Sequence, residues 1–375
     1  MFRLLPRSSS FNIWAWGKTS KDLTPVPRII ASVPVTSLAN GMDHSGYVSE
    51  GKVWIYGPSS PVLIDSLSDC TSITCGPWHS VCQYMDGTVR SFGWGGSWMS
   101  GAGGLGLGSK APALVPTLVP GLPSVVQVAC GNQHTLFLTD TGAVWATGHG
   151  AYGILGTGDS GDELVPVELS AISQSIHPEE TVVKIACGGT FSAILTDKGN
   201  LYVWGRNDSG QLGLGEESQG DMHSAERYPR LIPFFEKSGI LIKDITCGET
   251  HMVALTENGA LYYWGDRQWL EPHLVSLPEA NGGIAGIKEI SGGSKFSLAL
   301  TDDGLLFGWG AKKSDCLIVE SPSAISPILI PPSVFGNQKV LSVNANRNRC
   351  SVATDPKQLV ATTDEEAQNL SDILL

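Results

Sequence analysis

The sequence contains no run of about 18 consecutive apolar residues, which excludes a transmembrane helix. It also has little positive charge: 24 Lys and Arg residues stand against 36 Asp and Glu residues, for a net charge of −12. This excess of negative charge disfavours nonspecific attraction to DNA or anionic lipid. There is no basic tail of the kind expected in a chromatin-binding protein, so we expect no chromatin partner.

Motifs for catalysis and cofactor binding are missing as well. Gly103 and Gly108 are spaced as in a phosphate-binding loop, but Lys110 is not followed by Ser or Thr and no helical pattern begins there. Cys70 and Cys75 have a zinc-like spacing without a second pair of ligands. The histidines outside the repeats form no triad with a serine or cysteine. We therefore predict no catalytic residue, no cofactor and no metal site.

What the sequence does have is one short motif repeated about seven times. The clearest copy begins at Cys247-Gly248 and His251, continues through an apolar run to a turn at Gly259, and ends in Trp264-Gly265. The position of His251 is occupied in the other copies by His44, His79, His134, Phe191, Phe296 and Arg349. Since a strand averages about 5–6 residues, the distance between copies leaves room for about four strands per repeat.

The pattern inside each repeat is that of β-strands joined by tight turns. Residues 182–187 and 191–195 are apolar and partly β-branched, and residues 201–204 follow a turn at Gly199. No convincing helical periodicity occurs before the C-terminal tail. Repeats of this length, carried by glycines and aromatic residues, predict an all-β, seven-bladed β-propeller over residues 11–355.

The two ends of the repeat array complement each other. Trp14 to Gly17 form a Trp-Gly half-motif with no His half before it, whereas residues 340–355 contain the other half with no Trp-Gly after it. We predict that an N-terminal strand around residues 12–16 completes the last blade, which would be formed by residues from about 318 to 355. This pairing would close the ring and remove its open sheet edges.

The motifs resemble the regulator-of-chromosome-condensation repeat family over residues 11–355. The family repeat joins Cys-Gly-x-x-His-Ser to Trp-Gly-x-Asn-x-x-Gly-Gln-Leu-Gly, and Trp204 to Gly213 match the second half almost letter for letter. Three copies depart from the pattern because no Gly-x-Leu-Gly follows the tryptophan, namely at Trp16, Trp264 and Trp309. The resemblance implies the seven-bladed propeller fold.

Three functions are compatible with this resemblance. The family's mitochondrial branch implies an interaction platform in the matrix or at the inner membrane, linked to mitochondrial ribosome assembly and GTPase regulation, with the ribosome or its RNA as a partner. The nuclear founder of the family exchanges nucleotide on the GTPase Ran, which implies guanine-nucleotide exchange on a small or dynamin-like GTPase. The third is a cytosolic adaptor of ubiquitin or membrane-traffic machinery. All three are binding functions rather than covalent chemistry.

The two ends of the chain differ in composition from the repeats. Residues 1–10 contain Arg3, Arg7 and three serines, and no acid appears before Asp22. This is the composition of a mitochondrial import signal, so residues 1–10 are predicted to be a targeting leader, with a cytoplasmic location as the alternative. Residues 356–375 are predicted to form an acidic flexible tail.

Most cysteines and histidines belong to the repeat. Cys75, Cys130, Cys187 and Cys247 share one position in separate blades, too far apart for the Cα spacing of about 5–6 Å that a disulfide needs. We expect all eight cysteines to be reduced thiols. The repeated histidines are exchangeable for Phe, so they are predicted to be structural, with their ring nitrogens bonded to backbone carbonyls.

One segment contains more aromatic residues than the repeat requires. The template asks for a single aromatic-glycine pair in the second repeat, which Phe92-Gly93 supplies, but Trp94, Trp98 and Met99 follow it in a glycine-rich loop. Exposed tryptophans are favoured anchors in protein interfaces. These three residues are the predicted partner-binding site, although they could instead cover the central channel or a neighbouring loop.

Overall fold

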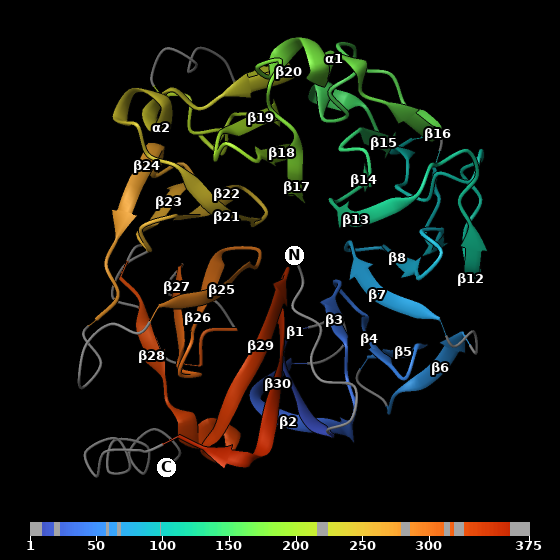
Figure 1. Cartoon of the computed structure of the whole chain (residues 1–375). Helices are drawn as coiled ribbons and strands as arrows, with labels where there is room; N and C mark the ends of the chain where they lie inside the picture. The colour runs from blue at the N-terminus through green and yellow to red at the C-terminus, as the bar shows by residue number, and fades with distance from the viewer. Residues whose placement is uncertain are drawn as a thin grey trace.

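The computed structural model describes residues 10–18, 23–57, 60–65, 69–97, 99–215, 224–278, 286–310, 316–318 and 326–360. Seven four-stranded antiparallel sheets are arranged around a central axis (Figure 1). The predicted all-β, seven-bladed propeller is therefore confirmed. Residues 1–9 of the expected leader, residues 361–375 of the expected tail and Trp98 lie outside the described part of the chain.

The first four blades follow one another along the chain, and the four strands of each run in order from the axis to the rim. Blade 1 contains β3 (Ser37–Asn40), β4 (Ser45–Ser49), β5 (Lys52–Tyr56) and β6 (Val62–Asp65). Blade 2 contains β7 (Cys70–Cys75), β8 (His79–Tyr84), β9 (Val89–Gly93) and β12 (Ala113–Leu118). Blade 3 contains β13 (Val125–Cys130), β14 (His134–Thr139), β15 (Val144–Gly148) and β16 (Glu163–Glu168). Blade 4 contains β17 (Val182–Cys187), β18 (Phe191–Thr196), β19 (Leu201–Arg206) and β20 (Ala225–Leu231).

The remaining blades continue the ring. Blade 5 contains β21 (Ile242–Cys247), β22 (His251–Thr256), β23 (Leu261–Gly265) and β24 (Trp269–Val275). Blade 6 contains β25 (Ile287–Gly292), β26 (Phe296–Thr301), β27 (Leu306–Gly310) and β28 (Ile328–Ile330). Blade 7 contains β29 (Gln338–Asn346), β30 (Arg349–Leu359), β1 (Phe11–Lys18) and β2 (Leu23–Val33). Smaller elements lie in the connections: the hairpin of β10 (Gly96–Ser97) and β11 (Gly101–Ala102), η1 (Ala151–Gly153), α1 (Ser170–Ser175), α2 (Pro233–Ser238) and η3 (Pro332–Phe335).

The N-terminal strand closes the ring as predicted. Strand β1 pairs antiparallel with β30, with Trp16 opposite Cys350. The N-terminal segment also supplies the outer strand β2, so blade 7 takes two strands from each end of the chain. The C-terminal share of this blade is smaller than expected at its start, because β28 belongs to blade 6, and it continues past residue 355 to Leu359.

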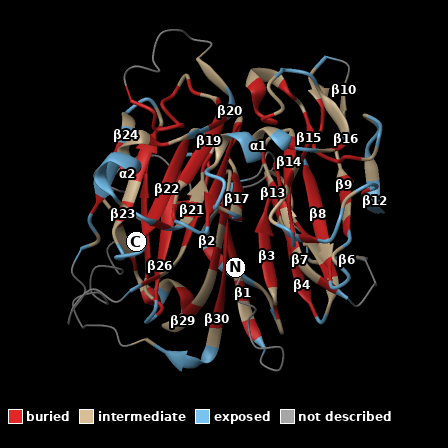
Figure 2. Ribbon diagram, turned by 45° about the horizontal axis from the view of Figure 1, so that its top comes forward, coloured by how far each residue is buried: buried red, intermediate tan, exposed pale blue. Residues whose placement is uncertain are grey.

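The apolar core lies between neighbouring blades rather than inside each one. Phe191 of blade 4 packs in one buried cluster with Met252 and Trp264 of blade 5. Phe296 of blade 6 lies in a corresponding cluster with Cys350 and Trp16 of blade 7. Figure 2 shows that buried residues follow the inner strands of every blade, whereas exposed residues gather at the rim and loops. Each blade therefore depends on its neighbours for the burial of its apolar faces.

The repeated histidines link consecutive blades, but not as predicted. Their Nε2 atoms contact a hydroxyl of the next blade instead of a backbone carbonyl: His44 to Ser80 at 2.7 Å, His79 to Thr135 at 2.9 Å, His134 to Ser192 at 3.0 Å and His251 to Ser297 at 2.9 Å. The Thr135 hydroxyl itself donates to the Gly104 carbonyl at 2.7 Å, so it accepts the hydrogen bond from His79. Burial lowers the pKa of His79 to about 3, which keeps this ring neutral.

The two Phe residues at this position, which we call the latch position, face apolar partners. Phe191 meets Met252, and Phe296 meets Cys350, at the places where the His-bearing blades have Ser or Thr in the next blade. The residue type of the partner therefore depends on the latch residue: Ser or Thr faces His, whereas Met or Cys faces Phe. A buried hydroxyl is matched by a donor, and a buried ring without a donor is matched by an apolar side chain.

The glycine three residues before each His or Phe latch residue is required by close packing. A Cβ atom at Gly131 would lie 2.0 Å from Cε1 of His134, and one at Gly188 would lie 1.9 Å from Cε1 of Phe191. Such distances are far below van der Waals contact. The ring of the latch residue lies directly over the glycine, which explains the Cys-Gly-x-x-His spacing.

The repeated tryptophan fixes the loop of the preceding blade. Nε1 of Trp204 donates to the Ile154 carbonyl at 3.0 Å, and Nε1 of Trp264 donates to the Gln211 carbonyl at 3.0 Å. Trp309 is different: its buried Nε1 has no hydrogen-bond acceptor among the described residues. In blade 5 the long loop is replaced by a turn at Asp266-Arg267, whose φ angles are 53° and 61°. Because the loop motif after Trp264 is missing, no carbonyl of the described part of blade 5 accepts a hydrogen bond from Trp309 in the next blade.

This difference predicts unequal effects of the same substitution. Trp264→Phe should lower the free energy of unfolding more than Trp309→Phe, by about 1–3 kcal/mol, because only the first leaves a buried carbonyl without its donor. Urea unfolding of both variants measures the difference, and the shared loss of ring volume makes each variant the control for the other. Equal losses would show that the indole hydrogen bond contributes nothing.

Candidate protein-binding surface

In five of the seven blades, two loops meet on one face of the propeller. The residue after the glycine of the third strand donates its backbone N–H to the carbonyl of the residue before the latch position, over distances of 2.6–3.0 Å. The residue pairs formed in this way are Trp94 with Trp78, His149 with Gln133, Arg206 with Thr190, Asp266 with Thr250, and Lys18 with Asn348. The backbone geometry is constant while the side chains vary, so this face presents a different pair in each of these five blades.

Blade 2 presents two tryptophans at these positions. Trp78 is 45% exposed, Trp94 is half-buried, and Met99, beside the β10–β11 hairpin, is 79% exposed. We name Trp78, Trp94 and Met99 the aromatic patch. The structure thus brings Trp94 and Met99 to the same loop, as the sequence suggested, whereas Trp98 lies outside the described residues.

Trp78 is the residue that the sequence reasoning missed. It occupies a variable position of the Cys-Gly-x-x-His motif, whereas the sequence prediction relied on the constant positions of the motif. The available signal was its chemistry: the equivalent residues in the other six blades are polar, namely Asp43, Gln133, Thr190, Thr250, Lys295 and Asn348. An aromatic residue at a position that is elsewhere polar is a departure from the repeat.

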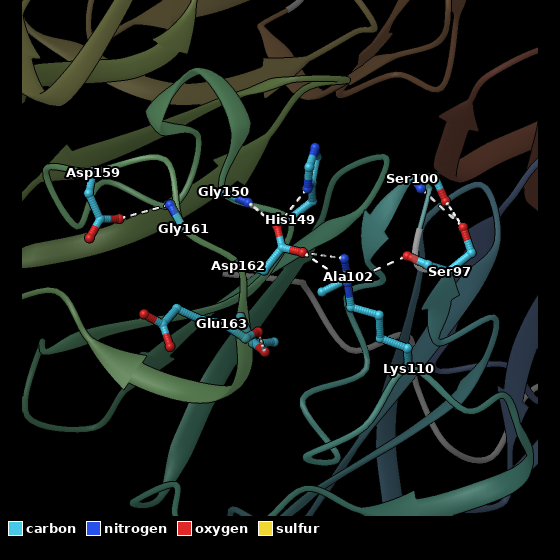
Figure 3. A network of polar contacts seen from close by, with 11 residues as sticks. Ser97, Ser100, Ala102, Lys110, His149, Gly150, Asp159, Gly161, Asp162 and Glu163 are labelled. Carbon is cyan, nitrogen blue, oxygen red and sulfur yellow. Dashed lines mark hydrogen bonds and ion pairs between the residues drawn. The ribbon is translucent and has the colours of Figure 1, made fainter.

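The loop that carries the patch is held by a network centred on Asp162 (Figure 3). Oδ2 of Asp162 accepts from the Ala102 N–H at 2.8 Å and from Nζ of Lys110 at 3.3 Å. Its Oδ1 lies 2.7 Å from Nδ1 of His149 and accepts from the Gly150 N–H at 3.2 Å. One carboxylate of blade 3 therefore fixes the loop of blade 2.

The Asp162 carboxyl group strongly favours its ionised form. Burial would raise the pKa of Asp162, but the hydrogen bonds from His149, Ala102, Gly150 and Lys110 lower it to about 2. A carboxyl whose pKa is lowered on folding stabilises the protein above its unfolded pKa of 3.8, and this contribution is lost only as the pH falls toward 2. The anchor is therefore ionised throughout the physiological range.

The centre of the same face is crossed by an arginine. NH1 of Arg347 lies 2.5 Å from Oε1 of Glu249, and its NH2 donates to Oδ1 of Asn132 at 2.5 Å. The Ser294 hydroxyl donates to the other carboxylate oxygen of Glu249 at 2.5 Å. Arg347 of blade 7 thus reaches blades 3 and 5 across the axis, and its side chain is only 18% exposed.

The inner strands place further charges around the axis. Lys184 pairs with Asp244 of the next blade. Glu289 accepts from the Val343 N–H at 3.3 Å and from the Ser342 hydroxyl at 3.3 Å. Burial raises the pKa of Glu289 to about 7 in spite of these bonds and of the nearby lysines. These side chains join neighbouring blades around the ring.

Ser297, His251 and Asp266 are arranged in the order of a catalytic triad, but the serine and the histidine are not accessible to a substrate. The Ser297 hydroxyl lies 2.9 Å from Nε2 of His251, and Nδ1 of His251 lies 3.4 Å from Oδ2 of Asp266. Both Ser297 and His251 are completely buried, so no substrate can reach the hydroxyl. The same His–hydroxyl contact recurs between other blades, which identifies it as a structural latch.

The described ranges also contain histidines, cysteines and carboxylates outside this triad-like arrangement. No group of three His, Cys, Asp or Glu residues there could hold a metal ion. The eight cysteines are free thiols, and burial raises the pKa of Cys75 to about 12. No helix in the described part is long and apolar enough to cross a membrane.

The seven four-stranded sheets define the chain as a seven-bladed β-propeller. Two models of the regulator of chromosome condensation (RCC1) repeat match this chain, one at residues 86–138, 141–195 and 198–255, the other at residues 125–154, 182–211 and 287–313. The chain belongs to the RCC1 repeat family. The family resemblance read from the sequence is thus confirmed.

Relatives of the chain are larger proteins. It is 35% identical over 197 residues to the human E3 ubiquitin-protein ligase HERC2, a match that covers 52% of this chain and 4% of HERC2. It is 33% identical over 280 residues to the ultraviolet-B receptor UVR8 of Arabidopsis thaliana, covering 67% of this chain and 60% of the receptor. The chain therefore spans less than two thirds of each of these relatives.

Solved structures share the fold over nearly the whole chain. Prp20p from Saccharomyces cerevisiae has a TM-score of 0.76 at 20% identity, covering 99% of this chain and 96% of its own. Human WBSCR16 has a TM-score of 0.74 at 20% identity, covering 93% of this chain and all of its own. At this level of identity, the likeness concerns the fold alone.

Proposed function

We propose that this protein is a non-catalytic interaction platform that binds a protein partner through the aromatic patch of blade 2. The observation that carries this proposal is the pairing of Trp78 with Trp94 at the two variable positions of one blade, followed on the same loop by Met99, which is 79% exposed. Large exposed apolar side chains grouped on one loop face are typical of protein interfaces. Tryptophans are the residues most enriched among their energetic hot spots.

The rigidity of the loop supports the same function. The β10–β11 hairpin pairs Gly96 with Ala102, and the Asp162 carboxylate holds Ala102 from the next blade. A loop that is already ordered loses less conformational entropy when it binds, so more of the contact energy appears as affinity. The aromatic patch is therefore presented in a binding-ready form.

Removal of the two tryptophans tests the proposal. The double variant Trp78→Ala, Trp94→Ala should reduce partner capture from cells at least about tenfold, because hot-spot truncations cost about 2 kcal/mol or more in binding. Leu274→Ala is the matched control, since Leu274 is 56% exposed on the rim of blade 5. Quantitative mass spectrometry after proximity labelling measures capture, and circular dichroism verifies the fold. Equal capture by wild type and double variant would contradict the proposal.

Guanine-nucleotide exchange on a GTPase is the second candidate. It is supported by the likeness to Prp20p over 99% of this chain, because Prp20p is described as binding Gsp1p and histones. Glu249 and Asp266, which lie on the loop face, are acidic residues of the kind that compete with nucleotide and magnesium. Catalytic amounts of the protein would then accelerate release of a fluorescent guanine nucleotide from the captured GTPase. Unchanged release would restrict the function to scaffolding.

We further propose a mitochondrial location, in the matrix or at the inner membrane, with the mitochondrial ribosome or its RNA among the partners. The support is the composition of residues 1–10, with two arginines and no acid. A fusion of residues 1–30 to a fluorescent protein should co-localise with mitochondria. A diffuse cytosolic signal would favour the adaptor of ubiquitin or membrane-traffic machinery instead.

A further inference from the structure

The rim of blades 1 and 2 exposes an unusual number of large apolar side chains. On β12, Leu114 is 87% exposed, Val115 is 61% exposed and Leu118 is 52% exposed; on β6, Val62 is 57% exposed and Leu63 is 40% exposed. The two strands lie next to each other. We name these five residues the apolar rim. Figure 2 shows β12 at the outer edge of the molecule, with β9 and β6 nearby.

In blades 3, 4 and 5 the corresponding strands protect the rim with charge. Each has a central proline, as β12 does, but β16, β20 and β24 also carry charged side chains, namely Glu163, Glu168, Glu226, Arg227, Arg230 and Glu271. Strand β12 reads Ala-Leu-Val-Pro-Thr-Leu and has no charged residue. Charges on edge strands prevent unwanted association. Their absence from β12 leaves an uncharged apolar surface where blades 3, 4 and 5 carry charges.

The rim is continuous with the aromatic patch. Ala113 at the start of β12 pairs with Gly93, the residue directly before Trp94. A Cβ atom at Gly95 would lie 2.2 Å from the Ala111 carbonyl oxygen, so the two segments are in close backbone contact. A partner seated on the aromatic patch therefore reaches β12 without crossing another blade.

The backbone of β12 is unsuited to an added strand. Pro116 has no N–H to donate, and the pairing of β12 with β9 shifts register between Ala113 and Thr117. An incoming strand needs regularly spaced donors and acceptors. Contact with this surface must therefore be made through side chains. An α-helix is about 10–12 Å wide with its side chains, enough to cover two adjacent strands.

We propose that the apolar rim binds the apolar stripe of an amphipathic helix on the partner protein. This inference rests on the proposed function, since it requires that the platform has a protein partner. It adds a second contact area on the side of the ring and states its chemistry: an uncharged stripe with residues spaced i, i+3, i+4 and i+7.

Site-specific photocrosslinking of the full chain in cells tests the inference. Benzoyl-phenylalanine at position 114 is expected to crosslink to one partner, at residues that map to a single face of a helix. The same probe at position 228 is the control, because Tyr228 is 55% exposed on the equivalent strand of blade 4. Leu118→Asp should reduce the yield from position 114 at least about fivefold. Val62→Asp, on the other strand, is a second variant in case the first lowers stability.

Three results would overturn the inference. They are crosslinks to an extended segment, crosslinks to a second copy of this chain, and a yield from position 114 no higher than from position 228. The aromatic patch is tested separately by capture with the Trp78→Ala, Trp94→Ala variant. If capture depends on the tryptophans but position 114 gives no partner crosslink, only the rim inference fails.

Discussion

Deletion of residues 1–17 is expected to unfold the whole propeller rather than its last blade alone. These residues include nearly all of β1, which lies between β2 and β30 in blade 7. Without β1, the outer strand β2 loses its partner, and the faces of blades 6 and 1 that pack on blade 7 are exposed. Because the apolar core lies between blades, the loss is transmitted around the ring.

The magnitude follows from the side chains that β1 buries. Phe11, Ile13 and Trp16 are at most 2% exposed, and each contributes about 1.5–3 kcal/mol through burial. Nε1 of Trp16 also donates to the Cys316 carbonyl at 2.9 Å. The sum is comparable with the whole stability of a typical domain, about 5–15 kcal/mol.

Thermal unfolding followed by circular dichroism measures this effect. The deletion should abolish the cooperative transition, with most of the protein insoluble. Deletion of residues 1–9 is the matched control, since it leaves all of β1 in place and should leave the Tm unchanged. A cooperative transition at the wild-type Tm after deletion of residues 1–17 would show that closure by β1 does not stabilise the ring.

Conversion of the Phe191–Met252 contact into a His–Ser contact is expected to lower the free energy of unfolding when only one of the two residues is changed. Changing both residues together should restore part of the lost stability. Phe191→His should lower the free energy of unfolding by about 2–4 kcal/mol, because it places a polar ring against the apolar Met252. Met252→Ser should cost a similar amount, since it leaves a cavity and a buried hydroxyl against Phe191. The double variant recreates the kind of His–Ser pair that joins His134 of blade 3 to Ser192 of blade 4 at 3.0 Å.

A double-mutant cycle gives the result. The coupling energy between positions 191 and 252 should be favourable by about 1–3 kcal/mol, measured by urea unfolding of the wild type, both single variants and the double variant. Phe296→His with Cys350→Ser provides an independent repeat of the cycle at the junction of blades 6 and 7. Strictly additive losses would mean that latch residues and their partners act separately.

The architecture could be predicted from the sequence because the motif of a blade is repeated several times along the chain. The template with Cys, His, Gly and Trp could be read from the copies, and its division between residues 14–17 and 340–355 located the closure of the ring. It also indicated a candidate surface at Trp94 and Met99. The same copies could not show that the histidines contact hydroxyl groups, because the partner of each lies in another repeat, as Ser297 does for His251.

The composition of the site required the folded chain. Trp78 and Trp94 are separated in sequence by two strands, and only the antiparallel pairing of β8 with β9 brings them together. Asp162 lies in blade 3, yet it fixes a loop of blade 2. Arg347 reaches Asn132 across the axis of the ring, a contact between blades 7 and 3.

The sequence by itself thus determined the fold class, the number of blades and the means of closure, because local strand and turn patterns repeat with the same spacing. Only the tertiary structure decided which variable residues share a face, which latch pairs with which partner, and that the rim at Leu114 and Val62 is apolar. The physical reason is that these features depend on contacts between blades. Such contacts join residues of different repeats, which only the closed ring brings together.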